Sequence, residues 1–488
     1  MLLGLDLGTT NIKALLVDDE GRIIARGARP VALEHTPDGG IEQDLETIWL
    51  ATLEAIREAG RSAAGAGLAA VRAVGISSQG GAIQVRTPDG RCLGPVISWM
   101  DPRGVPFDER FEQNVGRDWL VRRTGHGHSN MAIGQVLRLR ATRSGLLDPP
   151  AVLGFVGDAV VQRLCGRTAH DSSSLSICCL YNPWLQRADP ELLERLGLSE
   201  TQLPELIPVR RPAGPLRPEV ARRTGLPAGI PVGPAVHDQY ASALGCGAIR
   251  AGDVMLGAGT AWVLLAIADR LLPPIVPSAW VCNHLLPDRW GQLLSLVVGG
   301  SAFAWACDIT GLSRSSPVGR DELDEILASV PPGCEGLRLW PFLDGLGGER
   351  RPPDGRLLGL RLAHRREHLL RATVEGLCFE LARQVGWIEK AGIPVGRLIM
   401  CGGASESRVT PQIVADVTGR PVVCPHERDT SAFGAAILAA GMIEAQAPLA
   451  DVCVRMALKA RELRPGDAAA TYGPLVYEYV KALEEHTT

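Results

Sequence analysis

Apolar and polar positions in the first forty residues form blocks that predict strand, turn, strand, turn and strand. The apolar run 2–8 leads into the turn 9–11, a second apolar run follows at 12–18, and another turn at 19–21 precedes a third extended run. Short apolar blocks bounded by Gly, Thr, Asn and Asp are typical of hairpins. We therefore expect a hairpin followed by a third strand.

The period of the pattern changes after residue 44. Apolar side chains recur at 45, 48, 49, 53 and 56, which is the spacing of one face of a helix, and we expect this helix to end at Gly60. The apolar segment 71–78 then predicts a buried strand. Strands followed by a helix and another strand indicate an α/β layered domain.

The second half of the chain repeats this order. Residues 253–267 again form an apolar strand, a Gly/Thr turn and an apolar strand, and 366–392 has a helical pattern. Residues 397–407 predict a strand that runs into a Gly-rich turn. Thr410 and Pro411 then suit the N-cap and first position of a helix, because such residues favour helix starts.

We therefore expect two α/β halves, residues 1–245 and 246–488, with the junction within 245–252. The segment 203–234 is rich in Pro and Arg, and we interpret it as a surface connection between them. The small-residue segment 431–441 predicts a closely packed helix.

Composition narrows the class of protein. A chain of 488 residues is too long for one compact core, and its net charge of −4 gives no reason to expect nucleic acid or a membrane as partner. The N-terminus has Asp6 and lacks the basic region of a signal peptide. The twelve cysteines are scattered, so we expect reduced thiols and a cytoplasmic protein.

Two Gly/Thr turns, at 6–11 and 256–261, are the strongest local signals of chemistry. Such turns bring backbone N–H groups and hydroxyls to one point, which suits a phosphate. Asp6 offers a carboxylate to Mg²⁺. A single turn of this kind would be an ordinary hairpin, but two in matching positions favour phosphate binding. Lys13 either reaches a phosphate or lies at the surface.

A lone carboxylate, Asp238, stands at the end of a small, apolar run. Burying an unpaired carboxylate is costly, so its placement indicates a partner or a task. The alternative is a helix N-cap. The chain contains no Gly-Lys pair, which argues against a P-loop, and Arg250 replaces the third glycine of a dinucleotide fingerprint.

Together these motifs resemble the FGGY family of carbohydrate kinases. The resemblance rests on the two hairpins, on His-Asp-Gln at 237–239, on Cys-Gly-Gly-Ala-Ser at 401–405 and on the segment 355–376, and it spans about residues 2–445. It implies the two-domain sugar kinase/Hsp70/actin (ribonuclease H-like) ATPase fold, an α/β fold with a central interdomain cleft. It also implies ATP and Mg²⁺ as cofactors.

The resemblance assigns roles residue by residue. Asp238 would be the general base for the attacking sugar hydroxyl, and Gln239 would bind another substrate hydroxyl. Asp6 would hold the metal. The implied ATP-binding residues are Thr9, Thr10, Asn11 and Lys13 in the first loop, Gly259 and Thr260 in the second, and Gly300, Gly402, Gly403 and Ser407 in the nucleotide wall.

The sugar side departs from the family pattern. Xylulose kinases of this family usually have Gln-Met-His, and glycerol kinases Gln-Arg-Glu, where this chain has Gln79, Gly80 and Gly81. Two glycines leave room for a bulkier substrate or for another loop. The resemblance implies that Asp101, in a Trp-x-Asp-x-Arg segment, binds the substrate together with Gln79, Gly80 and Gly81. The overall pattern of motifs is most similar to that of xylulose kinases. This favours a ketopentose such as xylulose as substrate, with ribulose, glycerol and erythritol as alternatives.

Two other hypotheses remain open. His-Arg-Arg-Glu-His at 364–368 fits an inverted zinc-peptidase motif, and a chaperone-like ATPase would share the fold without needing Asp238. His126 and His128 are expected to form hydrogen bonds in a loop beside the sugar site. A homodimer is compatible with the sequence, which leaves the oligomeric state open.

Overall fold

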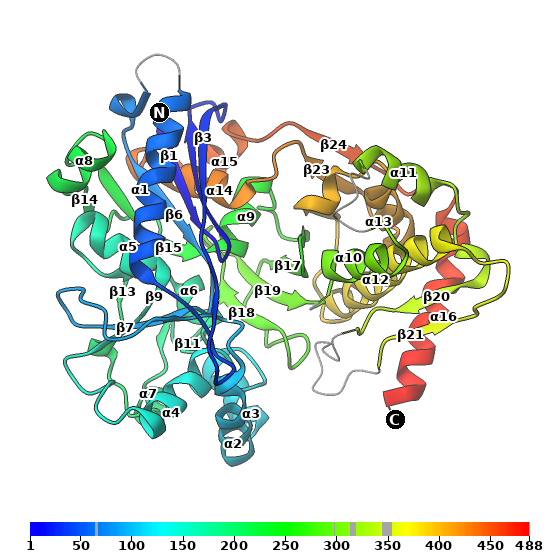
Figure 1. Ribbon diagram of the computed structural model, residues 1–488, viewed down its shortest axis with the longest axis horizontal. Helices are drawn as coiled ribbons and strands as arrows, with labels where there is room; N and C mark the ends of the chain where they lie inside the picture. Colours follow the sequence, from blue (N-terminus) through cyan, green and yellow to red (C-terminus); the bar gives the residue numbers. More distant parts are fainter. Residues whose placement is uncertain (64–66, 297, 313–318, 344–353, 488) are drawn as a thin grey trace.

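The computed structural model describes residues 1–63, 67–296, 298–312, 319–343 and 354–487. The chain forms two large mixed sheets, which lie side by side in Figure 1. In the first sheet, β1 (Leu2–Leu7), β2 (Asn11–Val17) and β3 (Ile23–Pro30) form an antiparallel meander. On the other edge of β1, β6 (Val74–Ser78) pairs in parallel, and β15 (Pro231–His237) pairs in parallel with β6.

The second sheet repeats this topology. Strands β16 (Asp253–Ala258), β17 (Trp262–Ala268) and β19 (Trp290–Ser295) are antiparallel neighbours. On the other edge of β16, β22 (Arg397–Cys401) pairs in parallel, followed by β23 (Val422–Pro425). The predicted Gly/Thr hairpin near the start of each half is therefore confirmed.

The remaining elements surround these sheets. The other strands are β4 (Glu34–His35), β5 (Ile41–Gln43), β7 (Ile83–Arg86), β8 (Val96–Ile97), β9 (Val152–Phe155), β10 (Ala169–His170), β11 (Tyr181–Asn182), β12 (Arg187–Ala188), β13 (Glu205–Leu206), β14 (Gly214–Pro215), β18 (Trp280–Asn283), β20 (Arg338–Trp340), β21 (Arg356–Leu358) and β24 (Ala460–Leu463). The helices are α1 (Leu45–Ser62), α2 (Val105–Val115), α3 (Arg117–Thr124), α4 (Ala132–Thr142), α5 (Val156–Cys165), α6 (Ser172–Ile177), α7 (Pro190–Arg195), α8 (Pro218–Thr224), α9 (Asp238–Cys246), α10 (Gly300–Ile309), α11 (Arg320–Ala328), α12 (Arg366–Lys390), α13 (Thr410–Thr418), α14 (Thr430–Ile443), α15 (Leu449–Arg455) and α16 (Ala469–Thr487).

Helix α1 forms where its apolar period predicts. The side chain of Asp44 caps its first turn by accepting the backbone N–H of Thr47, and the apolar face is buried against β2 and β3. The helix continues two residues past Gly60, the predicted end, to Ser62.

Alternation along β1 decides which side chains face which core. Leu3, Leu5 and Leu7 belong to the core that α1 covers, so Gly4 and Asp6 face the opposite side of the sheet. Helix α14 lies on that side, against β1, β6 and α9, as Figure 1 shows. The pleat therefore aims Asp6 toward a helix from the far end of the chain.

Helix α14 approaches its neighbours backbone to backbone. A Cβ atom would lie 1.9 Å from the Ala432 carbonyl oxygen if placed on Gly4, and 1.8 Å from the Ala435 carbonyl oxygen if placed on Gly75. On the α9 side, a Cβ at Gly434 would lie 1.8 Å from the carbonyl oxygen of Ala241. Only glycine fits at these crossings, which confirms the close packing predicted for 431–441.

The interpretation of 203–234 as a surface connection is wrong. This segment contains β13, β14, α8 and the start of β15, and it adds strands to the first sheet. Leu216, Val220 and Val232 are buried there. Its prolines start α8 and β15 instead of marking an irregular loop, so the composition hid the apolar positions between them.

In the part of the chain that the structure describes, every helix is too short or too polar to span a lipid bilayer.

The α14 crossing predicts a strong effect of one methyl group. Gly434→Ala should destabilise the fold by about 1–3 kcal/mol, because its Cβ meets backbone that cannot rotate away. Gly386→Ala is the matched control, since a Cβ there meets nothing within 4 Å in the middle of α12, and it should be neutral or stabilising. Thermal unfolding followed by circular dichroism measures both; an unchanged melting temperature for Gly434→Ala would contradict the packing described.

Candidate active site

Asp6 lies at the end of β1, just before the first Gly/Thr turn. It stands directly opposite Lys13 in the β1–β2 ladder, and its Oδ1 accepts a hydrogen bond of 3.0 Å from Ser431 Oγ. Burial raises the pKa of Asp6 to about 6; Lys13 opposes this shift, and the negative charges of Asp238 and Asp429 add to it. The carboxylate is thus buried beside two others.

Asp238 is the first residue of α9, directly after β15. The N-cap position belongs to His237, so the structure does not use Asp238 as the helix cap. Its side chain retains 28% exposure, yet desolvation raises its pKa to about 7 while hydrogen bonds from Gln239 lower it. Because its charge raises the pKa of Asp6, the two predicted acidic residues are electrostatic neighbours.

The second Gly/Thr turn is contacted by two other segments that the resemblance assigned to the nucleotide site. The Gly300 N–H donates to the Gly259 carbonyl oxygen at 2.9 Å, and the Ser301 N–H donates to that of Thr260 at 3.0 Å. A Cβ at Gly402 would lie 2.9 Å from the Ala258 carbonyl. The start of α10 and the turn after β22 thus both contact this hairpin.

Gln239 connects the two halves of the site. A Cβ on Gly257, in the strand before the second turn, would lie 3.2 Å from Gln239 Oε1. The amide next to the predicted base therefore reaches the predicted nucleotide side.

Ser407 has a structural task that the sequence analysis missed. Its Oγ accepts the N–H groups of Val409 and Thr410, at 3.1 and 2.9 Å, and donates to Asp324. The expectation that Thr410 caps the helix is therefore wrong, because Thr410 is already helical and the capping hydroxyl comes from Ser407. Gly403 opens the short 3₁₀ turn 403–406 before it.

Lys13 forms an ion pair, with its Nζ 2.9 Å from Asp429 Oδ1. Its side chain is 35% exposed, and Arg26 also contacts Asp429, at 3.3 Å. Asp429 immediately precedes α14, and sequence reasoning missed it. An acidic residue at the start of a small-residue helix was the signal available.

A hydrogen-bond network links the first turn to the sugar-side segment. Thr9 Oγ1 donates to Gln79 Oε1 at 3.1 Å, and Trp99 Nε1 donates to Thr9 Oγ1 at 3.1 Å. Gln43, which the sequence analysis did not single out, accepts from Gln79 and donates to the Thr9 carbonyl. In the same turn Thr10 and Asn11 are exposed, and their side chains bond to one another.

The room left by Gly80 and Gly81 is filled by other parts of the protein. A Cβ on Gly80 would lie 2.5 Å from two atoms of the His237 ring. Gly81 has a φ of +77°, and a Cβ there would lie 2.9 Å from Trp99 Cβ. Of the two alternatives, bulkier substrate or another loop, these contacts favour the second.

Asp101 is engaged by the protein itself. It accepts the Ile41 N–H at 2.9 Å and contacts the Arg103 guanidinium at 2.7 Å. Burial tends to raise its pKa, but these donors outweigh burial and lower it. The geometry thus gives Asp101 a role in holding Arg103 and the segment around 41.

The side chains of the histidines singled out in the sequence contact neighbouring protein groups. His126 stacks on Trp280 with ring centroids 4.0 Å apart, and His128 Nδ1 lies 3.2 Å from Glu112 Oε1. Nδ1 atoms of His364 and His368 accept backbone N–H groups at 3.0 and 3.3 Å. Among the described residues no group of three or more His, Cys, Asp or Glu side chains is arranged to hold a metal ion, as a zinc peptidase would require.

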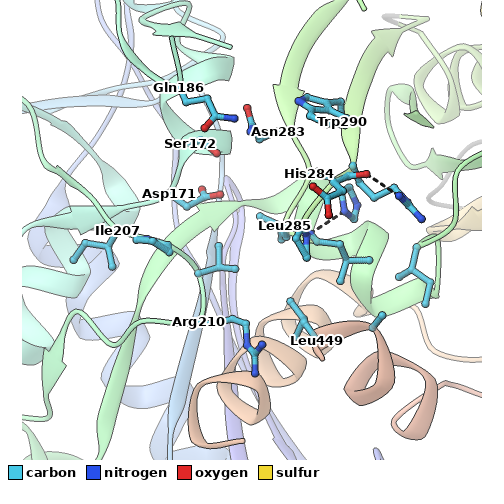
Figure 2. A pocket seen from close by; sticks show the side chains of 18 of the residues that line it. Asp171, Ser172, Gln186, Ile207, Arg210, Asn283, His284, Leu285, Trp290 and Leu449 are labelled. Carbon is cyan, nitrogen blue, oxygen red and sulfur yellow. Dashed lines mark hydrogen bonds between the residues drawn. The ribbon is translucent and has the colours of Figure 1, made fainter. Parts of the chain in front are cut away.

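A cavity of about 770 Å³ lies apart from these groups (Figure 2). Its walls come from Asp171 and Ser172 at the start of α6, from 206–210, from 283–290 and from 448–450. None of the residues predicted for the site lines it. We look for the site beside Asp6 and Asp238 instead, because their carboxylates are electrostatic neighbours and Gln239, next to Asp238, lies beside Gly257 of the second hairpin.

Comparisons with known proteins identify relatives of both halves of the chain. Residues 1–245 match the family model for the N-terminal domain of the FGGY family of carbohydrate kinases, and residues 254–442 match the model for its C-terminal domain. The chain is similar to a xylulose kinase of Escherichia coli strain K12, with 27% identity over 97% of this chain and 96% of the relative. It is also similar to a glycerol kinase of Thermus brockianus, with 31% identity over 89% of this chain and 88% of the relative.

Solved structures with a similar fold also include a xylulose kinase. The crystal structure of xylulose kinase from Rhodospirillum rubrum superposes with a TM-score of 0.89 at 25% identity, covering 99% of this chain and 98% of that one. The proteins of this kinase family have the actin/Hsp70-like ATPase fold, which the resemblance implied and with which the two repeated sheets agree. With both halves of the chain matched, in sequence and in fold, this protein belongs to the FGGY family of carbohydrate kinases.

Proposed function

We propose that this kinase transfers the γ-phosphoryl group of ATP to a hydroxyl group of a ketopentose such as xylulose. The observation that carries the proposal is the setting of Asp238, a carboxylate with a pKa raised to about 7, whose charge raises the pKa of Asp6 and whose neighbour Gln239 lies beside Gly257 of the second hairpin. A base with a pKa near the working pH is both deprotonated and basic enough to accept a proton. Phosphoryl transfer needs little else from the protein except positioning and charge neutralisation.

Each residue around Asp238 supports one part of this reaction. The Asp238 carboxylate accepts the proton of the sugar hydroxyl as its oxygen attacks phosphorus. Gln239 orients the substrate from the adjacent position, and Lys13 supplies positive charge beside the first turn. Thr9, Thr10 and Asn11 offer hydroxyl and amide groups to phosphate, as do the backbone groups of Gly259 and Thr260 in the second turn.

Four further residues are assigned to the wall of the nucleotide site. We assign Gly300, Gly402, Gly403 and Ser407 to that wall, where Gly300 and Gly402 already contact the second turn. Ser407 contributes by capping α13 and so fixing the end of the Gly-rich segment.

The residues around Asp6 fit a magnesium ion. Asp6 is a buried carboxylate whose charge is disfavoured by burial and by two neighbouring carboxylates, so a cation would stabilise it. Mg²⁺ prefers one or two carboxylates together with waters and phosphate oxygens, which is the donor set available there. When bound, it would offset the negative charge of the phosphoryl oxygens.

The choice of a ketopentose rests on the sugar-side segment. Relatives named as xylulose kinase and glycerol kinase have comparable identity to this chain, at 27% and 31%. Gln79 and Trp99 both form hydrogen bonds with Thr9, so the segment that contains Gln79 lies beside the first turn. We assign substrate contacts to Gln79 and the 80–81 backbone, and we give Asp101 the task of holding that segment.

We also propose a division of labour between residues 1–245, which carry the sugar side and the first turn, and residues 246–488, which carry the nucleotide side. Asp238 lies at the end of the first part, next to Gly257 of the second through Gln239. This contact supports the proposal that the base acts where substrate and nucleotide meet.

A screen of acceptors tests the substrate. In a coupled assay of ADP formation, we expect ketopentoses to give the highest kcat/KM among ketopentoses, ketohexoses, glycerol and other polyols. A preference for a polyol would reject the ketopentose but not the kinase. ATP hydrolysis that no acceptor stimulates would favour the chaperone-like ATPase of the same fold.

Replacing the base tests the mechanism. Asp238→Asn should lower kcat by about a thousandfold or more, because it removes the proton acceptor, while ATP affinity measured by calorimetry stays within about threefold. Asp416→Asn is a control, since Asp416 is a buried carboxylate that accepts from Gln412 and the Gly466 N–H on the far side of α13. Turnover retained by Asp238→Asn would remove this residue from the mechanism.

The raised pKa of Asp238 predicts the acid limb of the pH profile. Because desolvation moves the pKa from 3.8 to about 7, the carboxylate is protonated and inactive below that value. We therefore expect kcat/KM for the sugar to fall tenfold per pH unit below about pH 7. A limb centred near pH 4 would show that Asp238 is not desolvated or is not the base.

A further inference from the structure

The imidazole of His237 lies against the predicted base. Its Nε2 is 3.1 Å from Asp238 Oδ1, and its side chain is only 6% exposed, compared with 28% for Asp238. One face of the carboxylate therefore meets a buried ring, while the rest remains accessible.

The ring faces Asp238 as a hydrogen-bond donor. Burial lowers the pKa of His237 to about 3, so the imidazole is neutral at physiological pH and carries one N–H. Its Nδ1 is buried and has no hydrogen-bond partner among the described residues. The proton belongs on Nε2, because a lone pair there would be repelled by the carboxylate oxygen.

The backbone of His237 is held from the opposite side. Its N–H donates to Ser173 Oγ at 2.9 Å, and that hydroxyl donates to Asp171 Oδ1 at 2.6 Å. Asp171 is itself fixed as the N-cap of α6, at the wall of the cavity in Figure 2. These contacts fix the end of β15 from which the ring projects.

Gly80 provides the space that the ring occupies. A Cβ at position 80 would lie 2.5 Å from both Cδ2 and Nε2 of His237, and 2.9 Å from Ile177 Cγ2. Because heavy atoms do not approach within 3.0 Å of a Cβ, either the backbone at position 80 or the His237 ring would have to move. A side chain at position 80 and the observed ring position therefore exclude each other.

We propose that His237 is a positioning residue for the catalytic carboxylate, and that Gly80 is the residue that makes room for it. The Nε2–H group holds Oδ1 of Asp238, so the other carboxylate oxygen is left to receive the proton of the sugar hydroxyl. This inference rests on the proposed role of Asp238 as the base. It adds a task to a residue that composition and motif spacing left unassigned.

The proposed Nε2–H contact would also make Asp238 more acidic. A donor to the charged form lowers the pKa of a carboxylate, so under this proposal His237 would act in the same direction as the hydrogen bonds from Gln239, which oppose the rise caused by burial. Without it the carboxylate would hold its proton up to higher pH. If loss of this donor raises the pKa of Asp238 by about 1 unit, the deprotonated fraction of Asp238 near neutral pH falls about tenfold.

The test compares His237→Leu with His237→Gln. Leucine removes the donor, so we expect kcat to fall about tenfold and the acid limb of the kcat/KM profile to move upward by about 1 pH unit, with KM for ATP unchanged. Glutamine carries an amide N–H that reaches toward the same oxygen and should recover most of both effects. Equal losses in the two variants with an unmoved acid limb would overturn the proposal.

A control separates positioning from general packing. His284 is also a buried histidine with a pKa lowered to about 3, and its Nδ1 accepts the Leu286 N–H. We expect His284→Leu to lower the melting temperature without moving the acid limb. A shift of the limb in this variant equal to that in His237→Leu would show that any loss of a buried imidazole suffices, and would overturn the specific role.

Gly80 is tested by a double-mutant cycle. Gly80→Ala should lower kcat at least fivefold in the natural chain, because the new Cβ displaces the ring, but at least threefold less in the His237→Gly background. Equal effects in both backgrounds would reject the link between the two positions.

Failure of this inference is distinguishable from failure of the proposed function. Asp238→Asn that is inactive, together with His237→Leu that keeps the natural acid limb, rejects only the role of His237. Asp238→Asn that retains turnover rejects the base itself.

Discussion

The site depends on one steric constraint, the backbone contact between α14 and its neighbours. Glycines on β1, β6 and α9, together with Gly434 on α14, let the helix approach to a distance at which no Cβ would fit. This approach places Ser431 against Asp6 and Asp429 against Lys13, although α14 and β1 lie at opposite ends of the chain. A wider separation would leave Asp6 without that hydroxyl and Lys13 without its counter-ion.

The same packing contributes to the electrostatics. Burial, together with the charges of Asp238 and Asp429, raises the pKa of Asp6 to about 6, and desolvation raises the pKa of Asp238 to about 7. Lys13 opposes the rise at Asp6. An arrangement that costs stability in this way is typical of a functional site, because a structural core would pair or exclude these groups.

Local patterns in the sequence predicted much of the fold. The hairpins at 6–11 and 256–261 and the helix at 45–62 follow from short-range alternation and period, and these features do not depend on distant residues. The two turns and Asp238 were also identifiable, since their residue types are chemically unusual for their surroundings. The repetition of the pattern was enough to predict two similar sheets.

What sequence could not show depends on contacts between distant segments. Ser407 caps α13 although Thr410 looked the better candidate, and Gln43 joins the first turn to Gln79 from a separate strand. The space beside Gly80 looked available to substrate until the fold placed His237 in it. In 203–234 the abundance of Pro and Arg suggested a surface connection, but Pro218 and Pro231 are the first residues of α8 and β15.

The position of α14 also has a consequence for biosynthesis. The face of β1 and β6 that carries Gly4 and Gly75 is covered by a helix near the C-terminal end, at 430–443. A ribosome therefore releases almost the whole polypeptide before this face can be closed, and until then an apolar surface of the first sheet stays open to solvent. Nascent chains of this protein should rely on chaperones during that interval, and truncation before α14 would leave the first sheet permanently unfinished.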